Sequence, residues 1–300
     1  DEAECYCIDW TGVKNSPRLS VGFGDRLNIY GSAIFSEGVN MGISGHIELK
    51  GADSHSLTLN NTSGSVAFLE IEATGTYDIL SDITLNRNLL IRSGTVNFND
   101  HVISVGASSG SIGLLGDGTV FNAQSATFNC VRLNFFNWNT NPEFNAGNST
   151  FIVTEEIMVQ SNSNTKFVFN ELVLDGTVVV DGSHTVSNLT INPGSSISFQ
   201  ENSTTTVENN LILAGTKAQP ISLTSSLSGT QANLSKVSGT VEASYLVLQD
   251  IAASGGATFN ATQTIDNGNN SGWNITSLTA MDYYWVGNGG NWSDFANHWA

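Results

Sequence analysis

Short apolar triplets separated by polar turn residues fill the sequence between Lys166 and Leu213. Each triplet is too short for a helix, and most are rich in β-branched residues, which are typical of strands. No Asn-Gly or Asp-Gly doublet joins two long strands, so a series of hairpins is not indicated. The triplets are Phe167–Phe169, Leu172–Leu174, Val178–Val180, Leu189–Ile191, Ile197–Phe199 and Leu211–Leu213.

Similar units recur along the chain at a nearly constant interval. The Asn-Leu-Thr-Ile unit at Asn188–Ile191 returns as Asn-Leu-Ile-Leu at Asn210–Leu213, and the Ser-Gly-Thr-Val unit at Ser93–Val96 returns as Asp-Gly-Thr-Val at Asp117–Val120. A period of roughly 20–25 residues that holds three short strands is the signature of a solenoid coil. The sequence therefore predicts an all-β chain wound as a right-handed parallel β-helix of roughly eleven coils, with a capping segment at each end.

We expect three segments. Residues 1–26 do not show the coil pattern and are predicted to form an N-terminal cap or the end of an inter-module joint, with Trp10 over the first coil. A cap is expected there because an open end of a β-helix exposes unpaired backbone groups. Residues 27–276 hold the repeated strands, and residues 277–300 change to an aromatic, Gly/Asn-rich run.

The charge of the chain excludes some partners. Charged residues make up only 12% of the sequence, and the net charge is −17 with ten Lys and Arg residues. A phosphate backbone would repel such a chain, so we expect no nucleic-acid partner, and an anionic membrane surface is disfavoured for the same reason. No apolar run approaches the length of a membrane-spanning helix, so we expect no direct membrane insertion.

Three cysteines, Cys5, Cys7 and Cys130, are too few for a disulfide framework. We expect one or two thiols packed at a strand end, and pairing of Cys5 or Cys7 with another thiol is the alternative. The chain begins with Asp1 instead of Met, which is typical of a mature chain or of a piece of a longer one.

Two aromatic groups have both a structural and a functional interpretation. The run at residues 127–138, TFNCVRLNFFNW, is expected to fill a wide part of the core, and a sugar-stacking strip is the alternative. The second group is expected to form an aromatic cap or an inter-module joint, and a carbohydrate platform is the alternative. Its members are Trp273, Tyr284, Trp285, Trp292 and Trp299.

The sequence offers little for catalysis, and we predict that the chain is not an enzyme. Glycoside hydrolysis needs two carboxylates on one site, whereas the neighbours Glu155 and Glu156 should face opposite sides of a strand. The basic residues that a lyase could use are scattered, and the five histidines show no ligand spacing. These basic residues are Arg87, Arg92, Arg132 and Lys166, and the histidines are His46, His55, His101, His184 and His298.

One oxygen-rich cluster could hold calcium. Asp266, Asn267 and Asn269 offer the oxygen ligands that Ca²⁺ prefers, with Asn270 beside them. A full calcium loop would carry more acids and a terminal Glu. An Asn-rich turn is therefore the main interpretation, and calcium is the only cofactor that the sequence suggests.

Three signatures in order resemble one tandem module of the giant repetitive surface adhesins of Bacteroidetes-type bacteria, including SprB-like gliding adhesins exported by type IX secretion. In those proteins the third signature usually opens the next module. The resemblance covers essentially the whole chain and is strong at both ends. The first signature is Cys7–Val13 with Asn15–Pro17 and Leu27–Ser32, the second is Ser228–Lys236 with Ser238–Val241 and Asp266–Trp273, and the third is Tyr284–Gly287 with Gly290–Asp294 and Asn297–Trp299.

The resemblance implies a non-catalytic structural and adhesive repeat module of a long extracellular fibre on the bacterial cell surface. Its partners would be neighbouring modules of the same chain, surface polysaccharides or other surfaces, and the outer-membrane secretion and motility machinery. The alternative is a carbohydrate-binding module that uses exposed aromatics with calcium. A β-helix polysaccharide lyase or hydrolase is a third hypothesis, because this fold often hosts such enzymes.

Overall fold

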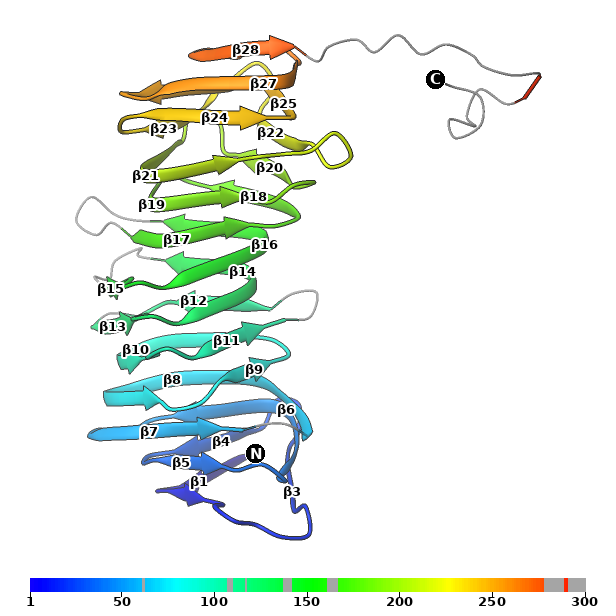
Figure 1. Cartoon of the computed structure of the whole chain (residues 1–300). Coiled ribbons are helices and arrows are strands. Elements are labelled where there is room, and N and C mark those ends of the chain that lie inside the picture. Colours follow the sequence, from blue (N-terminus) through cyan, green and yellow to red (C-terminus); the bar gives the residue numbers. More distant parts are fainter. Residues whose placement is uncertain are drawn as a thin grey trace.

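The computed structural model describes residues 1–60, 63–106, 110–116, 118–136, 142–160, 167–277 and 289–290. Within these residues it contains 28 strands and no helix. Every pairing between them is parallel, and each strand lies beside its counterpart one coil further on. The result is a β-solenoid of about 11 turns, drawn out as a rod (Figure 1). The predicted parallel β-helix is confirmed.

Paired strands form three columns that run along the rod, and the longest strands bend through a corner and belong to more than one. The first column contains β1 (Glu2–Cys5), β4 (Arg26–Ile29), β6 (Asn40–Leu49), β8 (Ser63–Ile79), β10 (Leu89–Asn97), β12 (Ser111–Leu114), β14 (Thr127–Phe136), β16 (Thr150–Gln160), β18 (Thr177–Asp181), β20 (Ser196–Phe199), β22 (Ile221–Ser225), β25 (Leu246–Gln249) and the end of β27 (Thr258–Asp266).

The second column begins with β2 (Ile8–Asp9), β5 (Ala33–Phe35), β7 (Ser54–Leu59), β13 (Thr119–Asn122) and β15 (Glu143–Asn145), and a later paired run contains β17 (Val168–Leu174), β19 (His184–Ile191), β21 (Thr204–Leu213), β23 (Ala232–Lys236) and β26 (Ile251–Gly255). The third column consists of parts of the long strands that bend through a corner, together with five strands of its own. These five are β3 (Arg18–Val21), β9 (Ile83–Leu85), β11 (Val102–Val105), β24 (Thr240–Ser244) and β28 (Trp273–Ser277).

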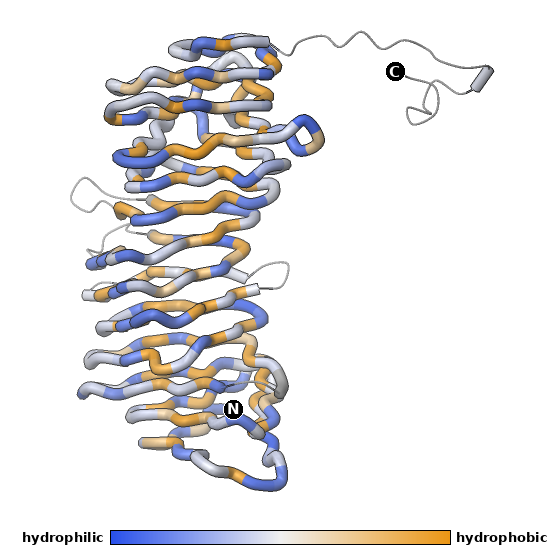
Figure 2. The backbone as a smooth tube through the Cα atoms, in the orientation of Figure 1, coloured by the Kyte–Doolittle hydropathy of each residue, from blue (hydrophilic) through white to orange (hydrophobic). Residues whose placement is uncertain are grey.

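Apolar side chains stack in register inside the rod. In the first column Leu27, Ile47, Leu69, Leu89 and Ile112 are paired in succession, and all five are buried. Residues on either side of each face outward, because successive side chains of a strand point to opposite faces. Figure 2 shows the apolar segments recurring from coil to coil. This stacking is the physical origin of the sequence repeat.

The register confirms one predicted repeat and corrects the other. Residues 188–191 pair with residues 210–213 in the predicted alignment. Thr95, however, pairs with Val120 and Val96 with Phe121, so the second repeat is one residue longer than sequence matching indicates. The apolar core decides this register, because it places the buried Val96 over the buried Phe121.

The coil begins earlier than expected. Strands β1, β2 and β3 pair in parallel with β4, β5 and β6, so the residues assigned to an N-terminal cap already form a coil. Its strands are too short and too irregularly spaced for the pattern to be visible in the sequence. The half-buried Trp10 does pack edge-on against Phe35 of the next coil, with ring centroids 6.0 Å apart. The segment at residues 277–300 lies almost wholly outside the described residues.

Asparagine ladders replace charge on the outer surface. Asn145 donates to Asn122 over 2.8 Å, Asn122 donates to Asn97 over 2.7 Å, and Asn97 donates to Asp78 over 2.6 Å. Each amide carries both a donor and an acceptor, so stacked asparagines satisfy one another without any net charge. This explains how a chain with few ionic residues keeps a polar surface.

The aromatic run at residues 127–138 lies in the core, as its main interpretation predicted, insofar as the structure describes its side chains. Phe128 and Phe135 are fully buried, and the fully buried Phe121 lies between them at centroid distances of 5.4 and 5.8 Å. Further contacts join Phe121 to Phe98 and Phe144 at 4.6 and 5.5 Å. The sugar-stacking alternative is excluded for Phe128 and Phe135, while Trp138 lies outside the described residues.

The phenylalanine cluster predicts a large and local stability effect. Phe121→Ala should reduce the free energy of unfolding by about 3–5 kcal/mol, because Phe121 is fully buried and contacts five other rings, so its removal leaves a cavity. The matched control is Phe23→Ala, which removes a ring that is 81% exposed and should change stability by no more than about 0.5 kcal/mol. Urea denaturation followed by circular dichroism measures both, and equal effects would contradict the cluster.

Candidate functional site

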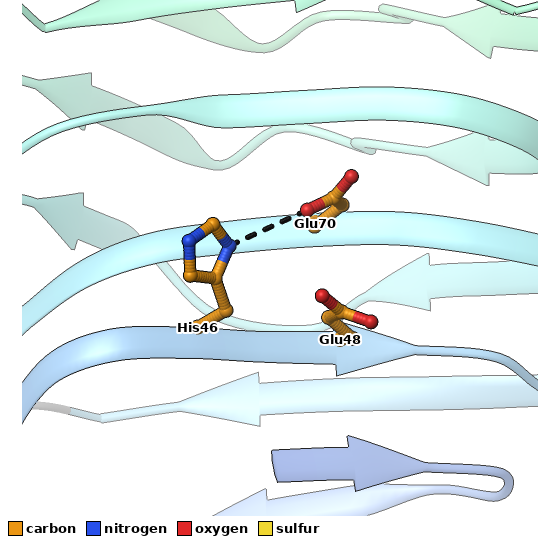
Figure 3. Close-up of side chains that lie close together, drawn as sticks. All are labelled: His46, Glu48 and Glu70. Carbon is orange, nitrogen blue, oxygen red and sulfur yellow. Dashed lines mark ion pairs between the residues drawn. The ribbon is translucent and has the colours of Figure 1, made fainter. Parts of the chain in front are cut away.

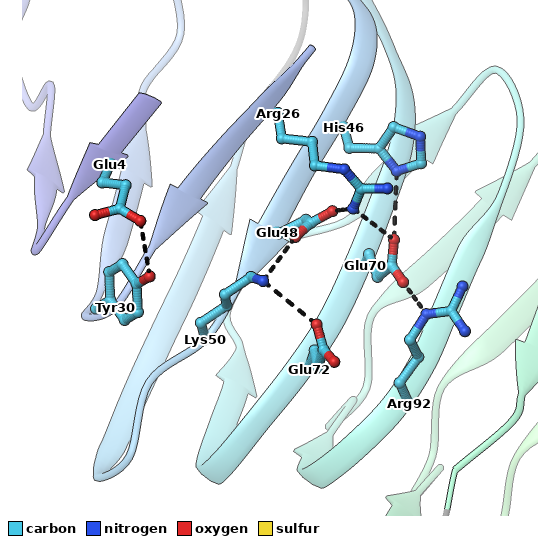
Figure 4. A network of polar contacts seen from close by, with 9 residues as sticks. All are labelled: Glu4, Arg26, Tyr30, His46, Glu48, Lys50, Glu70, Glu72 and Arg92. Carbon is cyan, nitrogen blue, oxygen red and sulfur yellow. Dashed lines mark hydrogen bonds and ion pairs between the residues drawn. The ribbon is translucent and has the colours of Figure 1, made fainter. Parts of the chain in front are cut away.

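A network of charged side chains lies on the outer side of β4, β6, β8 and β10 (Figure 4). We call it the charge network, and its members are Arg26, His46, Glu48, Lys50, Glu70, Glu72 and Arg92. Strand alternation sets its geometry, because Leu27, Ile47 and Leu69 point into the core and their neighbours therefore point outward.

Two glutamates form the centre of the charge network. The side chains of Glu48 and Glu70 are only 1% and 4% exposed, and the two residues are paired in register on neighbouring coils. Buried carboxylates are strongly destabilising unless they are paired. Here three of the ten Lys and Arg residues of the chain converge on them, namely Arg26, Lys50 and Arg92.

Each glutamate uses its two oxygens differently. Lys50 Nζ lies 3.0 Å from Glu48 Oε2, and Arg92 Nε donates to Glu70 Oε1. The other two oxygens face Arg26, whose Nη1 contacts Glu48 Oε1 and lies 3.7 Å from Glu70 Oε2. Lys50 also reaches the half-exposed Glu72 at 3.3 Å. The outer oxygens are therefore held in place by cations, and the inner oxygens share one central space.

His46 borders the same space. Its Nδ1 lies 3.4 Å from Glu70 Oε2, and its ring stacks on Phe68 with a centroid distance of 4.4 Å and an interplanar angle of 4°. Arg87 lies over the other ring of this pair, 5.8 Å from the Phe68 centroid. Burial lowers the pKa of His46, and the positive charge of Arg26 lowers it further. The imidazole is therefore neutral at neutral pH.

Sequence reasoning missed this network and wrongly described Arg92 as scattered. Arg26, Glu48, Glu70 and Arg92 follow one another at a constant interval of 22 residues, and Lys50 and Glu72 are separated by the same interval. The coils themselves are 20 or 22 residues long here, so each of these residues lies within two positions of the register partner of the one before it. A spacing of one coil brings residues together as surely as a short motif does. The signal was therefore present in the spacing of the charged residues, which is close to the period of the apolar repeat.

The prediction for Glu155 and Glu156 is also wrong. Glu155 Oε2 lies 3.3 Å from Arg132 Nη2, and Glu156 Oε2 lies 3.5 Å from Arg132 Nε, so both carboxylates meet one side chain. The pairing of β14 with β16 shifts register between Cys130 and Arg132. Strict alternation fails there because the chain turns a corner between two columns.

The residues predicted to bind calcium form a hydrogen-bonded turn. Asp266 Oδ1 accepts from the Gly268 backbone N–H at 2.9 Å and from Asn270 Nδ2 at 2.6 Å. Asn269 donates to Asp250 Oδ1 over 2.5 Å. Asn267 donates its backbone N–H to Leu248. These bonds account for the Asn-rich composition as a turn, in line with its main interpretation.

The aromatic residues at the end of the chain divide into two sets. The half-buried Trp273 packs against Phe259 with a centroid distance of 5.1 Å, and its Nε1 donates to the Ile251 carbonyl over 3.2 Å. It is thus attached to the last coils. The remaining predicted joint residues, Tyr284, Trp285, Trp292 and Trp299, lie outside the described residues.

Cys5 is partly buried at the end of β1, as expected for a thiol packed at a strand end, whereas Cys7 is exposed. Cys5, Cys7 and Cys130 are all free, and Cys130 is buried in the core. Burial raises the pKa of Cys130 to about 12. Burial and the neighbouring Cys7 raise the pKa of Cys5 as well.

A partly open pocket of about 260 Å³ lies beside β19. His184 and Thr205 are paired in register and buried, and neither the two ring nitrogens nor the hydroxyl has a hydrogen-bond partner among the described residues. Burial lowers the pKa of His184 to about 4. The pocket is lined by Val159, Phe167, Ser183, His184, Thr185, Thr204 and Thr206.

Comparison of the chain with protein families, with curated proteins and with solved structures finds no match in any of the three. In the part of the chain that the structure describes, no helix is long and apolar enough to cross a membrane.

The buried imidazole predicts acid sensitivity. The pKa of His184 is about 4 in the folded chain and 6.5 without the fold, so between these values the unfolded chain binds a proton that the folded chain excludes. His184 therefore leaves stability intact above pH 6.5 and lowers it as the pH falls toward 4, by about 3 kcal/mol in total.

The substitution His184→Leu should remove this contribution. The urea midpoint of the variant minus that of the wild type should therefore rise from pH 7.5 to pH 4.5, because only the wild type loses the stability linked to His184. The matched control is His101→Leu, because His101 is partly exposed beside Asp82 at 3.4 Å. A constant difference for His184→Leu across this pH range would contradict the buried, neutral assignment.

Proposed function

We propose that this chain is a non-catalytic spacer and adhesive module of a long fibre on the surface of a bacterial cell. One observation carries the proposal: the parallel ladder continues through about 11 turns with a continuous apolar core. Each coil adds about 4.8 Å, so the rod is roughly 50 Å long. Such a module supplies reach and stiffness, and both grow with copy number.

The outer surface supports this role. Asn ladders and rows of Ser and Thr provide a polar surface without much charge, and a net charge of −17 favours solubility over self-association. Attachment through many weak contacts gains strength when modules are repeated along one fibre. Neighbouring modules, surface polysaccharides and the outer-membrane secretion and motility machinery are the partners that the family resemblance suggests.

The carbohydrate-binding alternative receives less support. Phe128 and Phe135 are buried, and Trp273 is fastened to the last coils by a hydrogen bond and a ring contact. The turn at Asp266 uses its carboxylate within the chain. This alternative therefore rests on aromatic residues beyond Ser277.

The experiment that tests the proposal compares one, two and three copies of the chain joined in tandem. Circular dichroism should show a β-rich chain, and small-angle X-ray scattering should show a monomer whose maximum dimension grows by roughly 50 Å per copy. Adhesion to a polysaccharide-coated surface should strengthen more than proportionally with copy number. Compact particles of constant length, or release of sugar products from any polysaccharide, would contradict the proposal.

A glycan array with and without chelator separates the two functions. Under the proposal, Trp285→Ala and Trp292→Ala leave the weak binding of a single copy unchanged, and the chelator has no effect. Loss of glycan binding in either variant, with an unchanged circular dichroism spectrum, would favour the carbohydrate module instead.

A further inference from the structure

The inner oxygens of the charge network converge on one point. Glu48, Glu70 and His46 place one ligand atom each within 4.8 Å of one another (Figure 3). Glu48 and Glu70 come from successive coils, and His46 lies two residues before Glu48 on β6, which places its side chain on the same outer face. Two desolvated carboxylates and a neutral imidazole are a ligand set that suits a divalent cation.

A fourth group points to a ligand independently. Asn28 pairs in register with Glu48 and lies on the same outer face, because Leu27 and Ile29 on either side of it are buried in the core. Asn28 is only 3% exposed, yet its Oδ1 has no hydrogen-bond partner among the described residues. An unpaired buried carbonyl oxygen is destabilising unless a donor or a cation reaches it.

Arg26 stands where a cation would bind. Its Nη1 contacts Glu48 Oε1 and faces Glu70 Oε2 at 3.7 Å, so one guanidinium nitrogen bridges the two inner oxygens. The Arg26 side chain is 40% exposed, which leaves its path outward open. Lys50 and Arg92 hold the outer oxygens and fix the orientation of both carboxylates, as partners behind metal ligands commonly do.

We propose that Asn28, His46, Glu48 and Glu70 form a site for a divalent transition metal such as Zn²⁺, and that Arg26 competes with the metal for it. The nitrogen ligand favours Zn²⁺ over Ca²⁺, which prefers oxygen ligands only. The site is independent of the proposed spacer function, because neither the apolar core nor the Asn ladders contribute to it.

Charge sets the affinity of the site. Arg26, Lys50 and Arg92 already balance Glu48, Glu70 and Glu72, so a metal that enters beside Arg26 meets no excess of negative charge. The wild-type chain therefore binds weakly, because the metal must first displace the guanidinium. Removal of the Arg26 charge leaves two cations for three carboxylates and frees both inner oxygens.

The test is titration of Zn²⁺ at pH 7.5 by calorimetry, with Co²⁺ absorption as a spectroscopic readout of the ligand set. All chains carry Cys7→Ser, because the exposed Cys7 thiol could bind zinc by itself. Arg26→Gln should bind Zn²⁺ more tightly than the parent by on the order of tenfold or more, the scale on which groups next to a metal ligand act. Adding His46→Gln or Glu48→Gln to Arg26→Gln should abolish the gain.

Two controls make the outcome decisive. Glu72→Gln, added to Arg26→Gln, removes a carboxylate that touches Lys50 but lies outside the cluster, and it should leave the gain intact. If Arg26→Gln unfolds, Arg26→Met tests the same prediction with an apolar stem in its place. An Arg26 variant that folds by circular dichroism and binds Zn²⁺ no better than the parent overturns the proposal, and so does a gain that survives Glu48→Gln.

Discussion

In-register stacking of parallel strands is the constraint on which the rest of the molecule depends. Each residue stands directly over its counterpart in the previous coil, about 4.8 Å away. Like side chains therefore meet like side chains. Leu27, Ile47 and Leu69 stack as an apolar row inside the rod, and Asn97, Asn122 and Asn145 stack as an amide row outside it.

The same stacking explains why charge is rare. Two equal charges at the spacing of one coil repel by about 3 kcal/mol at an effective dielectric constant near 20. An amide in the same place donates to one neighbour and accepts from the other, so it gains where a carboxylate loses. Among the strand pairs of the described residues, Glu48 over Glu70 is the exception, and it is found where Arg26, Lys50 and Arg92 supply the opposite charge.

The sequence was sufficient for the solenoid because apolar triplets at a period of one coil are a local signal repeated many times. It failed where spacing was irregular. The repeat at Thr95 is one residue longer than the matching letters indicate, and the first coil has strands such as β2 that are only two residues long. Glu155 and Glu156 share Arg132 because a corner breaks the alternation that a straight strand would keep.

The candidate site was missed for a different reason. Catalytic and metal motifs are usually sought among residues close together in the sequence, which suit one helix or one loop. In a solenoid the neighbours of Glu48 are found about one coil away on either side, at Asn28 and Arg26 before it and at Glu70 after it. Such residues are recognised as a cluster only when the charged residues, like the apolar ones, are compared at the spacing of one coil.

The charge network is not required by the stacking. The outward row that holds Asn28, Glu48 and Glu70 continues through Leu90 and Gly113, which are uncharged and keep the ladder intact. Uncharged residues thus occupy the same row in the following coils, and the strands there still pair. Buried ion pairs are often no more stabilising than apolar residues of similar volume. The desolvated glutamates are therefore better explained by a task at this point of the surface than by the stability of the rod.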